Sequence, residues 1–233
     1  MKIQGSTVLV TGANRGLGLA FAQALLAAGA RKVYAGARDP STVTLPGVVP
    51  VKLDVTNAQD IAAAAALASD VDIVINNAGI TGDVALLDAK NGDNNLRRIM
   101  ETNLYGVHAL SVAFAPVLKK NGGGALVNML SALSWLSLPS TSAYSVSKAA
   151  AWALTNSLRN ELRAQGTQVL GIHAGYIDTD MASHVDGPKT SAADIAKRAL
   201  DALEHGQSEV LADDTAKQVK AGFNATPAAY IGA

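Results

Sequence analysis

Short apolar runs rich in β-branched residues alternate along the chain with longer alanine-rich stretches in which apolar residues recur at helical spacing. Apolar runs of this length predict buried strands, and their alternation with helices is typical of βα units on a parallel sheet. We therefore expect an α/β fold in which about seven parallel strands form a doubly wound sheet with helices on both faces. The predicted strands are residues 7–10, 32–35, 48–53, 73–75, 125–129, 168–173 and 209–212.

Start and stop signals between these strands predict the helices. Gly29 suits the left-handed position that ends a helix, whereas Thr190 or Ser191 suits an N-cap. Pro116 has no backbone N–H, so we expect it to kink or split the helix that contains it. The predicted helices are residues 16–28, 57–69, 93–120, 143–165 and 191–205, followed by a short helix at 213–222.

The chain carries no internal repeat, charge block or proline-rich linker, so residues 1–233 are expected to form a single domain. Residues 223–233 form an apolar tail that can cover a cleft or a subunit interface. The 19 basic residues balance 19 acidic ones, so no overall field draws the protein to nucleic acid or an anionic membrane. A small-molecule partner is expected instead.

The composition also limits the chemistry. The absence of cysteine excludes disulfides, thiolate catalysis and cysteine-ligated metals, and the histidines show no metal-ligand spacing, so no metal site is expected. The N-terminus lacks the features of a signal peptide, and no apolar run approaches the ~20 residues that span a bilayer. We therefore expect a cytoplasmic protein.

A glycine-rich motif lies between the first predicted strand and the first predicted helix. Gly12 allows a tight turn, Gly16 lets the backbone approach a pyrophosphate, and Gly18 permits close packing of the helix. The helix N-terminus presents free N–H groups and a partial positive charge to such a ligand. The other motif residues expected at the cofactor are Asn14, Arg15 and Leu17.

This spacing, TGxxxGxG, resembles the short-chain dehydrogenase/reductase family, and further motifs extend the resemblance. Asp54, followed by Val55, matches the family's adenine-contacting aspartate. The family's NNAG motif corresponds to Asn76, Asn77, Ala78 and Gly79. The resemblance implies a Rossmann-type fold that binds a nicotinamide dinucleotide.

Residues after the second predicted strand bear on the choice of cofactor. Arg38 follows this strand, and together with Arg15 it would place two guanidiniums around one ribose, which suits the 2′-phosphate of NADP(H). Asp39 supports the alternative, NAD(H), because a carboxylate there can bond a 2′-hydroxyl. Since neighbouring residues in extended chain point to opposite sides, Arg38 and Asp39 should not both face the ribose. We favour NADP(H).

Tyr144 and Lys148 share one helical face because they are four residues apart. A nearby ammonium favours the phenolate, so we expect Lys148 to lower the pKa of Tyr144 toward the working range. In the resembled family, Ser131 matches a serine at the same spacing before the tyrosine, and Asn103 matches an asparagine that interrupts a helix.

The resemblance assigns catalytic roles to Asn103, Ser131, Tyr144 and Lys148. Ser131 and Tyr144 would bind the carbonyl oxygen and Tyr144 would exchange the proton, while Lys148 also positions the nicotinamide ribose. Asn103 would link Lys148 to a chain of water molecules. The expected function is NADP(H)-dependent interconversion of a ketone or aldehyde and an alcohol, as in a carbonyl reductase of broad range. The alternative is a catalytically silent NADP(H)-sensing regulatory protein on the same fold.

The substrate side departs from the family's pattern. Gly175 follows Ala174, where the family usually has proline, so we expect a slightly looser turn before Ile177 and Thr179, which would touch the nicotinamide. Residues 180–190 make a short lid and suggest an open cleft. The residues expected to line its apolar wall are Leu133, Trp135, Leu138 and Tyr176. Trp135 can equally cover the edge of the core. The family often forms homodimers or homotetramers, which we also expect here.

Overall fold

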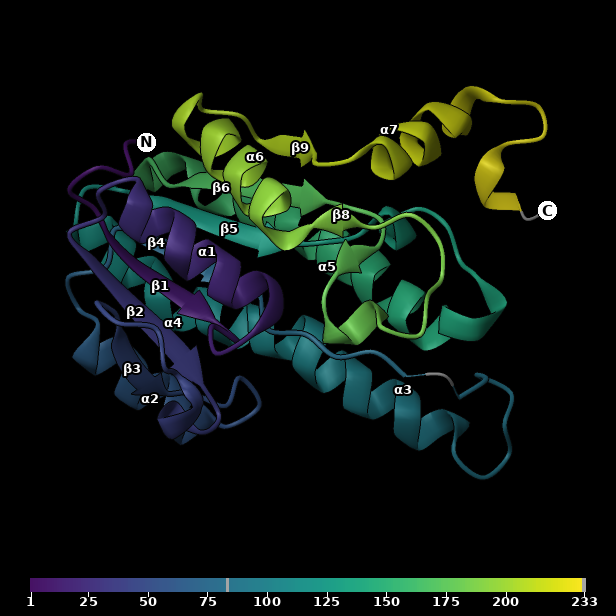
Figure 1. Cartoon of the computed structure of the whole chain (residues 1–233), viewed down its shortest axis with the longest axis horizontal. Helices are drawn as coiled ribbons and strands as arrows, with labels where there is room; N and C mark the ends of the chain where they lie inside the picture. The colour runs from purple at the N-terminus through teal and green to yellow at the C-terminus, as the bar shows by residue number, and fades with distance from the viewer. Residues whose placement is uncertain (83, 232–233) are drawn as a thin grey trace.

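A parallel sheet runs through the centre of the computed structural model, which describes residues 1–82 and 84–231 (Figure 1). Its seven strands are all parallel and lie in the order β3-β2-β1-β4-β5-β6-β9. Their valine- and isoleucine-rich centres are buried under helices on both faces, which confirms the predicted fold class. The strands are β1 (Thr7–Thr11), β2 (Lys32–Ala37), β3 (Val49–Lys52), β4 (Ile73–Asn76), β5 (Ala125–Met129), β6 (Gln168–His173) and β9 (Glu209–Leu211).

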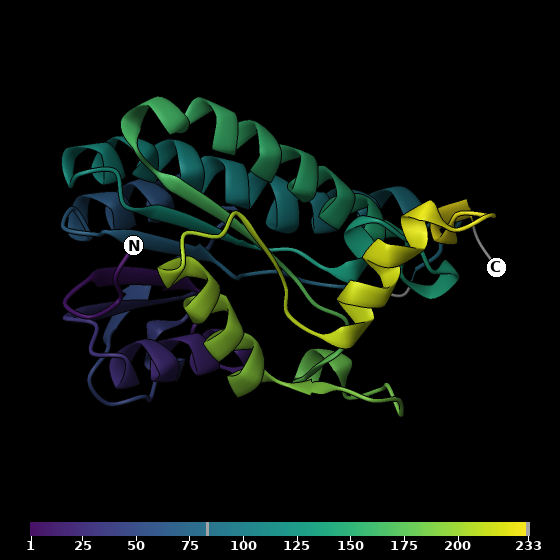
Figure 2. The same ribbon diagram turned by 90° about the horizontal axis from the view of Figure 1, so that it is seen from above.

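Two layers of helices cover the sheet, as Figure 2 shows. Helices α1 and α6 pack together on one face, and α2, α4 and α5 lie on the other. Each layer encloses its own apolar core, built around Phe21 and Leu203 on the first face and around Phe114 and Leu126 on the second. The helices are α1 (Gly16–Ala27), α2 (Ala58–Leu67), α3 (Gly92–Met100), α4 (Gly106–Lys120), α5 (Ser142–Glu161), α6 (Ala192–Glu204) and α7 (Asp214–Ala221).

The helix boundaries follow the predicted signals. Gly29 has a φ of +79°, in the left-handed region that ends α1. Ser191 caps α6 by accepting a hydrogen bond from the Asp194 N–H at 3.0 Å. These local contacts explain why both boundaries were visible in the sequence.

The helix predicted over residues 93–120 is interrupted at Asn103, as the resemblance implied, and not at Pro116. Pro116 lies inside α4, which continues to Lys120, so the expected split at this residue was wrong. The interruption is a π-helical turn at Glu101–Tyr105, between α3 and α4. Asn103, in this turn, makes side-chain hydrogen bonds to the segment after β4, a tertiary contact that local sequence signals do not contain.

A second, two-stranded sheet pairs β7 (Ile177–Asp178) with β8 (Thr190–Ser191) in parallel. It ties together the two ends of the segment predicted as a short lid. After α7 the chain continues to Ile231, at the right-hand end of the molecule in Figure 1. Gly232 and Ala233 of the predicted apolar tail lie outside the described residues. Among the helices that the structure describes, none combines the length and hydropathy needed to cross a membrane.

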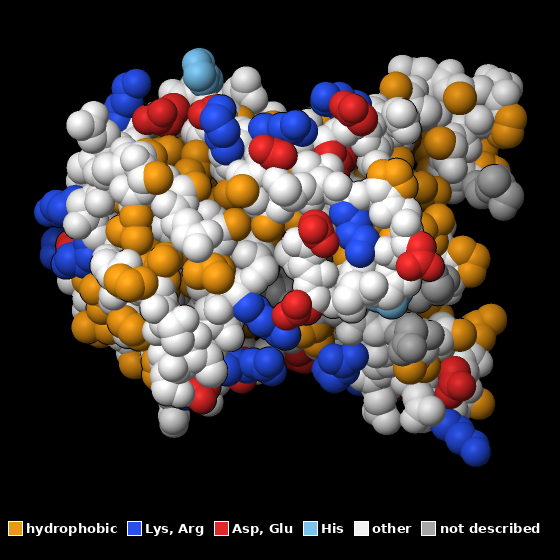
Figure 3. Space-filling model, viewed as in Figure 1, with side chains coloured by type: hydrophobic (Ala, Val, Ile, Leu, Met, Phe, Trp, Pro, Cys, Tyr) orange, Lys and Arg blue, Asp and Glu red, His pale blue; other side chains and the backbone are white. Residues whose placement is uncertain are grey.

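The direction of winding reverses between β1 and β4. The chain moves outward from β1 through β2 to β3, then returns to β4 and proceeds the other way. In such sheets ligands bind outside the carboxyl ends of the strands at the point of reversal. Figure 3 shows charges of both signs interspersed over one face of the molecule, in keeping with the balanced composition.

Candidate active site

The glycine-rich turn lies at the carboxyl end of β1. Gly12 and Gly16 adopt φ values of +65° and +54°, which strongly favour glycine. A Cβ on Gly18 would collide with the carbonyl oxygen of Gly12, so this position requires glycine for close packing. Arg15, the N-cap residue of α1, makes no side-chain capping bond. The start of α1 therefore retains N–H groups that suit a phosphate.

The NNAG segment braces this turn. Thr11 Oγ1 accepts hydrogen bonds from the N–H groups of Asn77 and Ala78 at 3.0 and 2.9 Å. The Asn77 side chain donates to the carbonyl of Thr11 at 2.9 Å. Asn76 points elsewhere, because its buried amide donates to Asn128 at 2.8 Å. The side chains of Asn76 and Asn77 thus make hydrogen bonds within the protein, and the chain then passes the glycine-rich turn through Ala78 and Gly79.

The ends of β2 and β3 form the region expected at the adenosine ribose. The Asp39 carboxylate accepts hydrogen bonds from the N–H and hydroxyl of Ser41 at 3.0 and 2.7 Å. It is therefore engaged in its own turn. The pKa of Asp54 is lowered chiefly by the Thr56 N–H, with smaller contributions from the charges of Arg38 and Lys52. Positive charge thus lies beside Asp54.

Arg15 makes its side-chain contact with a different segment. Its guanidinium is 3.2 Å from the carboxylate of Asp180, which follows β7 and Thr179. In the same place, a Cβ on Gly16 would be 3.3 Å from the Thr179 methyl group. The segment after β7 therefore lies against the glycine-rich turn. Because both charged side chains of the pair are mostly exposed, the ion pair holds Arg15 only weakly.

The other motif residues lie around the same edge. The Asn14 amide donates to the Thr42 hydroxyl at 3.1 Å. Leu17 is buried in the core beneath α1. Val55 packs against Gly106, where a Cβ would be 2.8 Å from its side chain. Ile177 lies in β7.

Tyr144 and Lys148 lie in the first two turns of α5. The Lys148 ammonium is 5.5 Å from the centroid of the Tyr144 ring and donates a hydrogen bond to the Met129 carbonyl at 2.7 Å. Lys148 is almost fully buried. Because β5 ends at Met129, this bond fixes the lysine at the carboxyl end of the central strands.

Ser131 is the N-cap of a short turn, Ala132–Ser134, that follows β5. Its hydroxyl accepts a hydrogen bond from the Leu133 N–H at 3.1 Å, and its N–H donates to the Ser134 hydroxyl. The Ser131 hydroxyl donates to the Ala174 carbonyl at 3.5 Å, and the Ser131 side chain lies close enough to the Tyr144 phenol to lower the pKa of that phenol. The structure thus brings Ser131, Tyr144 and Lys148 together.

Burial decides the protonation of the tyrosine and lysine. It raises the pKa of the Tyr144 phenol to about 12, against a smaller lowering by the Ser131 hydrogen bond. It lowers the pKa of Lys148 to about 8. The expected lowering of the Tyr144 pKa by the ammonium is therefore not observed, and desolvation determines the direction of the shift. Near neutral pH the phenol carries its proton.

Asn103 connects the π-helical turn with two neighbouring segments. Its carbonyl oxygen accepts from the Ile80 N–H at 2.8 Å, and its amide donates to the Ile80 carbonyl and the Ser147 hydroxyl at 2.9 and 3.0 Å. A Cβ on Gly79 would be 3.3 Å from Asn103 Oδ1 and 3.8 Å from Lys148 Nζ. Asn103 and Lys148 therefore border the same small space.

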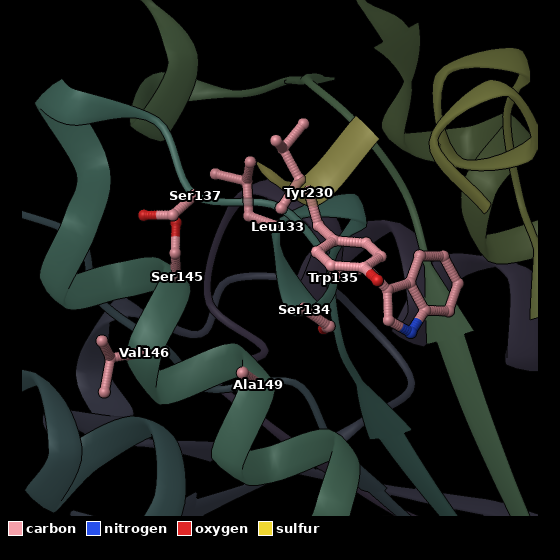
Figure 4. Close-up of a pocket in the computed structure, with 9 residues that line it drawn as sticks. Leu133, Ser134, Trp135, Ser137, Ser145, Val146, Ala149 and Tyr230 are labelled. Atoms are coloured by element: carbon pink, nitrogen blue, oxygen red, sulfur yellow. The ribbon is translucent and has the colours of Figure 1, made fainter. Parts of the chain in front are cut away.

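An open cavity of about 260 Å³ lies beside the Ser131 turn (Figure 4). Leu133 and Trp135, which were predicted at the wall of a substrate cleft, line this cavity, and Tyr230 reaches it from the C-terminal segment. Leu138 and Tyr176, also predicted to line the substrate cleft, do not line this cavity. Trp135 is also 93% buried in an aromatic cluster, in keeping with the alternative that it covers the edge of the core.

Comparison with known proteins identifies the family. The family model described as short chain dehydrogenase matches residues 6–189, which include Asn103, Ser131, Tyr144 and Lys148. This chain is a short-chain dehydrogenase. The match extends from the start of the sheet to the segment before α6.

Several relatives resemble this dehydrogenase over most of its length. A 3-oxoacyl-[acyl-carrier-protein] reductase of Vibrio cholerae is 32% identical over 201 residues, 82% of each chain. A short-chain dehydrogenase from Burkholderia cenocepacia, solved in complex with NADP, is 41% identical with a TM-score of 0.93, over 97% of this chain and 96% of that one. One from Streptomyces avermitilis has a TM-score of 0.82 at 26% identity, over 97% and 95% of the two chains.

Sequence reasoning missed supporting residues of the dehydrogenase that act through the backbone. Asp213 accepts a hydrogen bond from the Gly175 N–H at 2.7 Å and another from the Ala216 N–H at 2.8 Å. It thereby holds the turn that was expected to be loose for want of proline after His173. Asp213 begins the helix expected at residues 213–222, where an aspartate suits an N-cap, but its contact with Gly175 is 38 residues away in sequence and has no local signal.

Proposed function

We propose that this short-chain dehydrogenase is an NADP(H)-dependent oxidoreductase that interconverts ketones or aldehydes with alcohols, as a carbonyl reductase of broad small-molecule range. The observation that carries this proposal is the position of the Tyr144 phenol, which lies close enough to the Ser131 side chain for that serine to lower its pKa and lies beside the buried ammonium of Lys148. Two hydroxyl groups at one point suit a carbonyl oxygen that gains negative charge during reduction.

The residues of the glycine-rich turn fit a dinucleotide. The uncapped start of α1 suits its pyrophosphate, and the left-handed glycines keep side chains out of the way. NADPH, when bound, supplies the hydride for the carbonyl carbon. Lys148 would hold the nicotinamide ribose, and Thr179 and Ile177 would contact the nicotinamide from the segment that lies against the turn.

The four catalytic assignments follow from the positions of the side chains. Ser131 and Tyr144 would orient the carbonyl oxygen, and Tyr144, which is protonated near neutral pH, would give its proton to that oxygen. Lys148 keeps positive charge near the phenol and stabilises the phenolate that remains. Asn103, which borders the same space as Lys148, would position the water that returns the proton.

The preference for NADP(H) over NAD(H) is supported by the contacts of Asp39, by the two arginines and by a relative. The Asp39 carboxylate is engaged with Ser41 instead of standing free for a 2′-hydroxyl. Arg38 places positive charge at the same edge, and Arg15 needs only to leave an exposed ion pair to join it. The NADP bound to the Burkholderia cenocepacia relative points to the same cofactor.

The oligomeric part of the proposal is an association of copies through α4 and α5. Val112 and Val146 are 60% and 41% exposed on these helices, and a homodimer or homotetramer would bury them. Size-exclusion chromatography with light scattering measures the mass directly.

The test is the initial rate of NADPH oxidation with a panel of ketones and aldehydes, run in parallel with NADH. We expect turnover with NADPH that falls at least about 100-fold in Tyr144→Phe, because this change removes only the proton donor. Tyr105→Phe is the matched control, since Tyr105 is 54% exposed outside the cavity beside Ser131 and should leave the rate unchanged.

The regulatory alternative predicts a different result. A silent NADP(H)-sensing protein would bind NADPH but oxidise none of it with any carbonyl compound, in the wild type as in Tyr144→Phe. That outcome would reject the enzyme and retain the cofactor.

A further inference from the structure

His173, the last residue of β6, is fully buried and contacts the Ser131 turn in two ways. Its Nδ1 lies 3.0 Å from the Ser131 carbonyl oxygen. Its ring stacks on that of Trp135, with centroids 3.8 Å apart and an angle of 16° between the planes. Because a carbonyl can only accept, Nδ1 must carry the proton and donate it, which fixes the tautomer of the imidazole.

The His173 bond lies between two backbone hydrogen bonds that join the same segments. The Leu130 N–H donates to the Ile172 carbonyl, and the Ala132 N–H donates to the Ala174 carbonyl, each at 2.8 Å. The Ser131 carbonyl also accepts from the Ser134 N–H at 3.0 Å, within its own turn. The Ser131 hydroxyl donates a longer bond to the Ala174 carbonyl at 3.5 Å, so the imidazole, at 3.0 Å, is the shorter of the two contacts that fasten Ser131 itself to the neighbouring segment.

The other ring nitrogen indicates that the imidazole is neutral. Within residues 1–82 and 84–231, Nε2 makes no hydrogen bond, and Glu209, whose carboxylate pairs with Lys220, lies 3.5 Å away. Burial lowers the pKa of His173 to about 4, and the positive charges of Lys220, Lys148 and Arg159 act in the same direction. A neutral ring with the proton on Nδ1 satisfies the Ser131 carbonyl at every working pH.

We propose that His173 is a positioning residue for the carbonyl reduction. It would fix the Ser131 turn against β6 so that the Ser131 hydroxyl meets Tyr144 and the substrate oxygen, and its stacking would fix Trp135 at the wall of the adjoining cavity. This role rests on the proposed function, since it acts on the reaction only through Ser131. His173 itself touches neither substrate nor cofactor in this scheme.

Two substitutions separate the hydrogen bond from the stacking. His173→Phe keeps a ring for Trp135 but removes the donor, whereas His173→Asn keeps an N–H near the position of Nδ1 and removes the ring. We expect kcat to fall about 10- to 100-fold in His173→Phe with little change in the KM for NADPH, because small displacements of a catalytic group carry this cost. His173→Asn should recover most of the loss.

His205→Phe is the matched control. The Nδ1 of His205 also lies close to a backbone carbonyl, that of Asp201 at 2.6 Å, but on the exposed face of α6. This variant should keep the wild-type kcat. A loss of rate from folding defects alone would appear in the melting temperature and in NADPH binding, which are measured for each variant.

The decisive measurement combines His173→Phe with Ser131→Ala. If His173 acts through Ser131, His173→Phe adds little to the loss that Ser131→Ala already causes, whereas independent effects would multiply. In wild type, nitrogen-detected NMR of the imidazole should show a neutral ring protonated on Nδ1 at pH 7.

Three results would overturn the inference. An active wild type with an unchanged kcat in His173→Phe, or multiplying effects in the double variant, removes the positioning role but leaves the proposed function standing. An imidazole protonated on Nε2 contradicts the geometry directly. A wild type without turnover removes both the role and the function.

Discussion

Lys148 carries an ammonium group into the protein interior with a backbone carbonyl, that of Met129, as its hydrogen-bond partner. No carboxylate forms an ion pair with it among the described side chains. A buried charge without a counter-ion costs free energy, and burial accordingly lowers the pKa of Lys148 to about 8. Such a cost is expected where a residue serves the site instead of the fold.

Replacing this lysine should therefore stabilise the protein. The folded-state pKa of Lys148 lies below that of the unfolded chain, so its penalty is absent above pH 10.5 and grows as the pH falls to about 8. We expect Lys148→Met to raise the free energy of unfolding at pH 7 by about 1–3 kcal/mol, while abolishing turnover. Urea denaturation at pH 7 and at pH 11 measures the gain and its disappearance.

Lys197→Met is the control for this substitution. The Lys197 side chain is 74% exposed and pairs with Asp201 on the surface of α6, so its removal should change stability little at either pH. A Lys148→Met variant less stable than wild type at pH 7 would show that the packing around the ammonium outweighs its charge.

At the scale of elements, local patterns predicted what local contacts determine. The β-branched runs became strands, and Gly29 and Ser191 ended and began helices, because the forces involved act within a few residues. The interruption at Asn103 was indicated by the resemblance to a family and not by local signals, because Asn103 bonds to Ile80, which is 23 residues distant. Asp213 and His173 also support the candidate site from far along the chain.

The contact between Asn103 and Ile80 makes a prediction about this turn. Asn103→Leu keeps the approximate size of the side chain but leaves the Ile80 N–H without its acceptor. We expect hydrogen exchange of the Ile80 amide to accelerate by about tenfold or more, which corresponds to the loss of one buried hydrogen bond. Asn94→Leu, at an exposed position of α3, should leave that exchange rate unchanged. Equal protection of Ile80 in both variants would contradict the bracing role of Asn103.

For the molecule as a whole, the sheet topology assembles the candidate site. The reversal of winding between β1 and β4 brings the glycine-rich turn and the residues after β5 to one edge, so motifs separated in sequence could be placed together in advance. Two contacts could not be specified residue by residue, although the apolar tail was expected to cover a cleft or a subunit interface. The pairing of Arg15 with Asp180 and the approach of Tyr230 to Trp135 depend on the paths of loops, which the strand pattern does not determine.

The choice between the two cofactors affects the stability of the entire fold, because a ligand stabilises the native state that binds it. A ligand that binds the native state at 100 times its Kd adds about 2.7 kcal/mol of stability. At equal concentration, NADPH should therefore raise Tm more than NADH does, and Arg38→Leu should remove most of that difference. The control is Arg163→Leu, at an exposed position after α5. A larger shift with NADH would reassign the ribose contact to Asp39.

The contact between Arg15 and Asp180 has a consequence for the exchange of cofactor. The two residues close the gap between the glycine-rich turn and the segment after β7, yet both side chains are mostly in water. Ions at physiological concentration screen such a pair over about 8 Å, so the bridge yields readily to thermal motion. Binding and release of the dinucleotide would then be faster at high ionic strength. A phosphorylated ribose would compete with Asp180 for the guanidinium of Arg15.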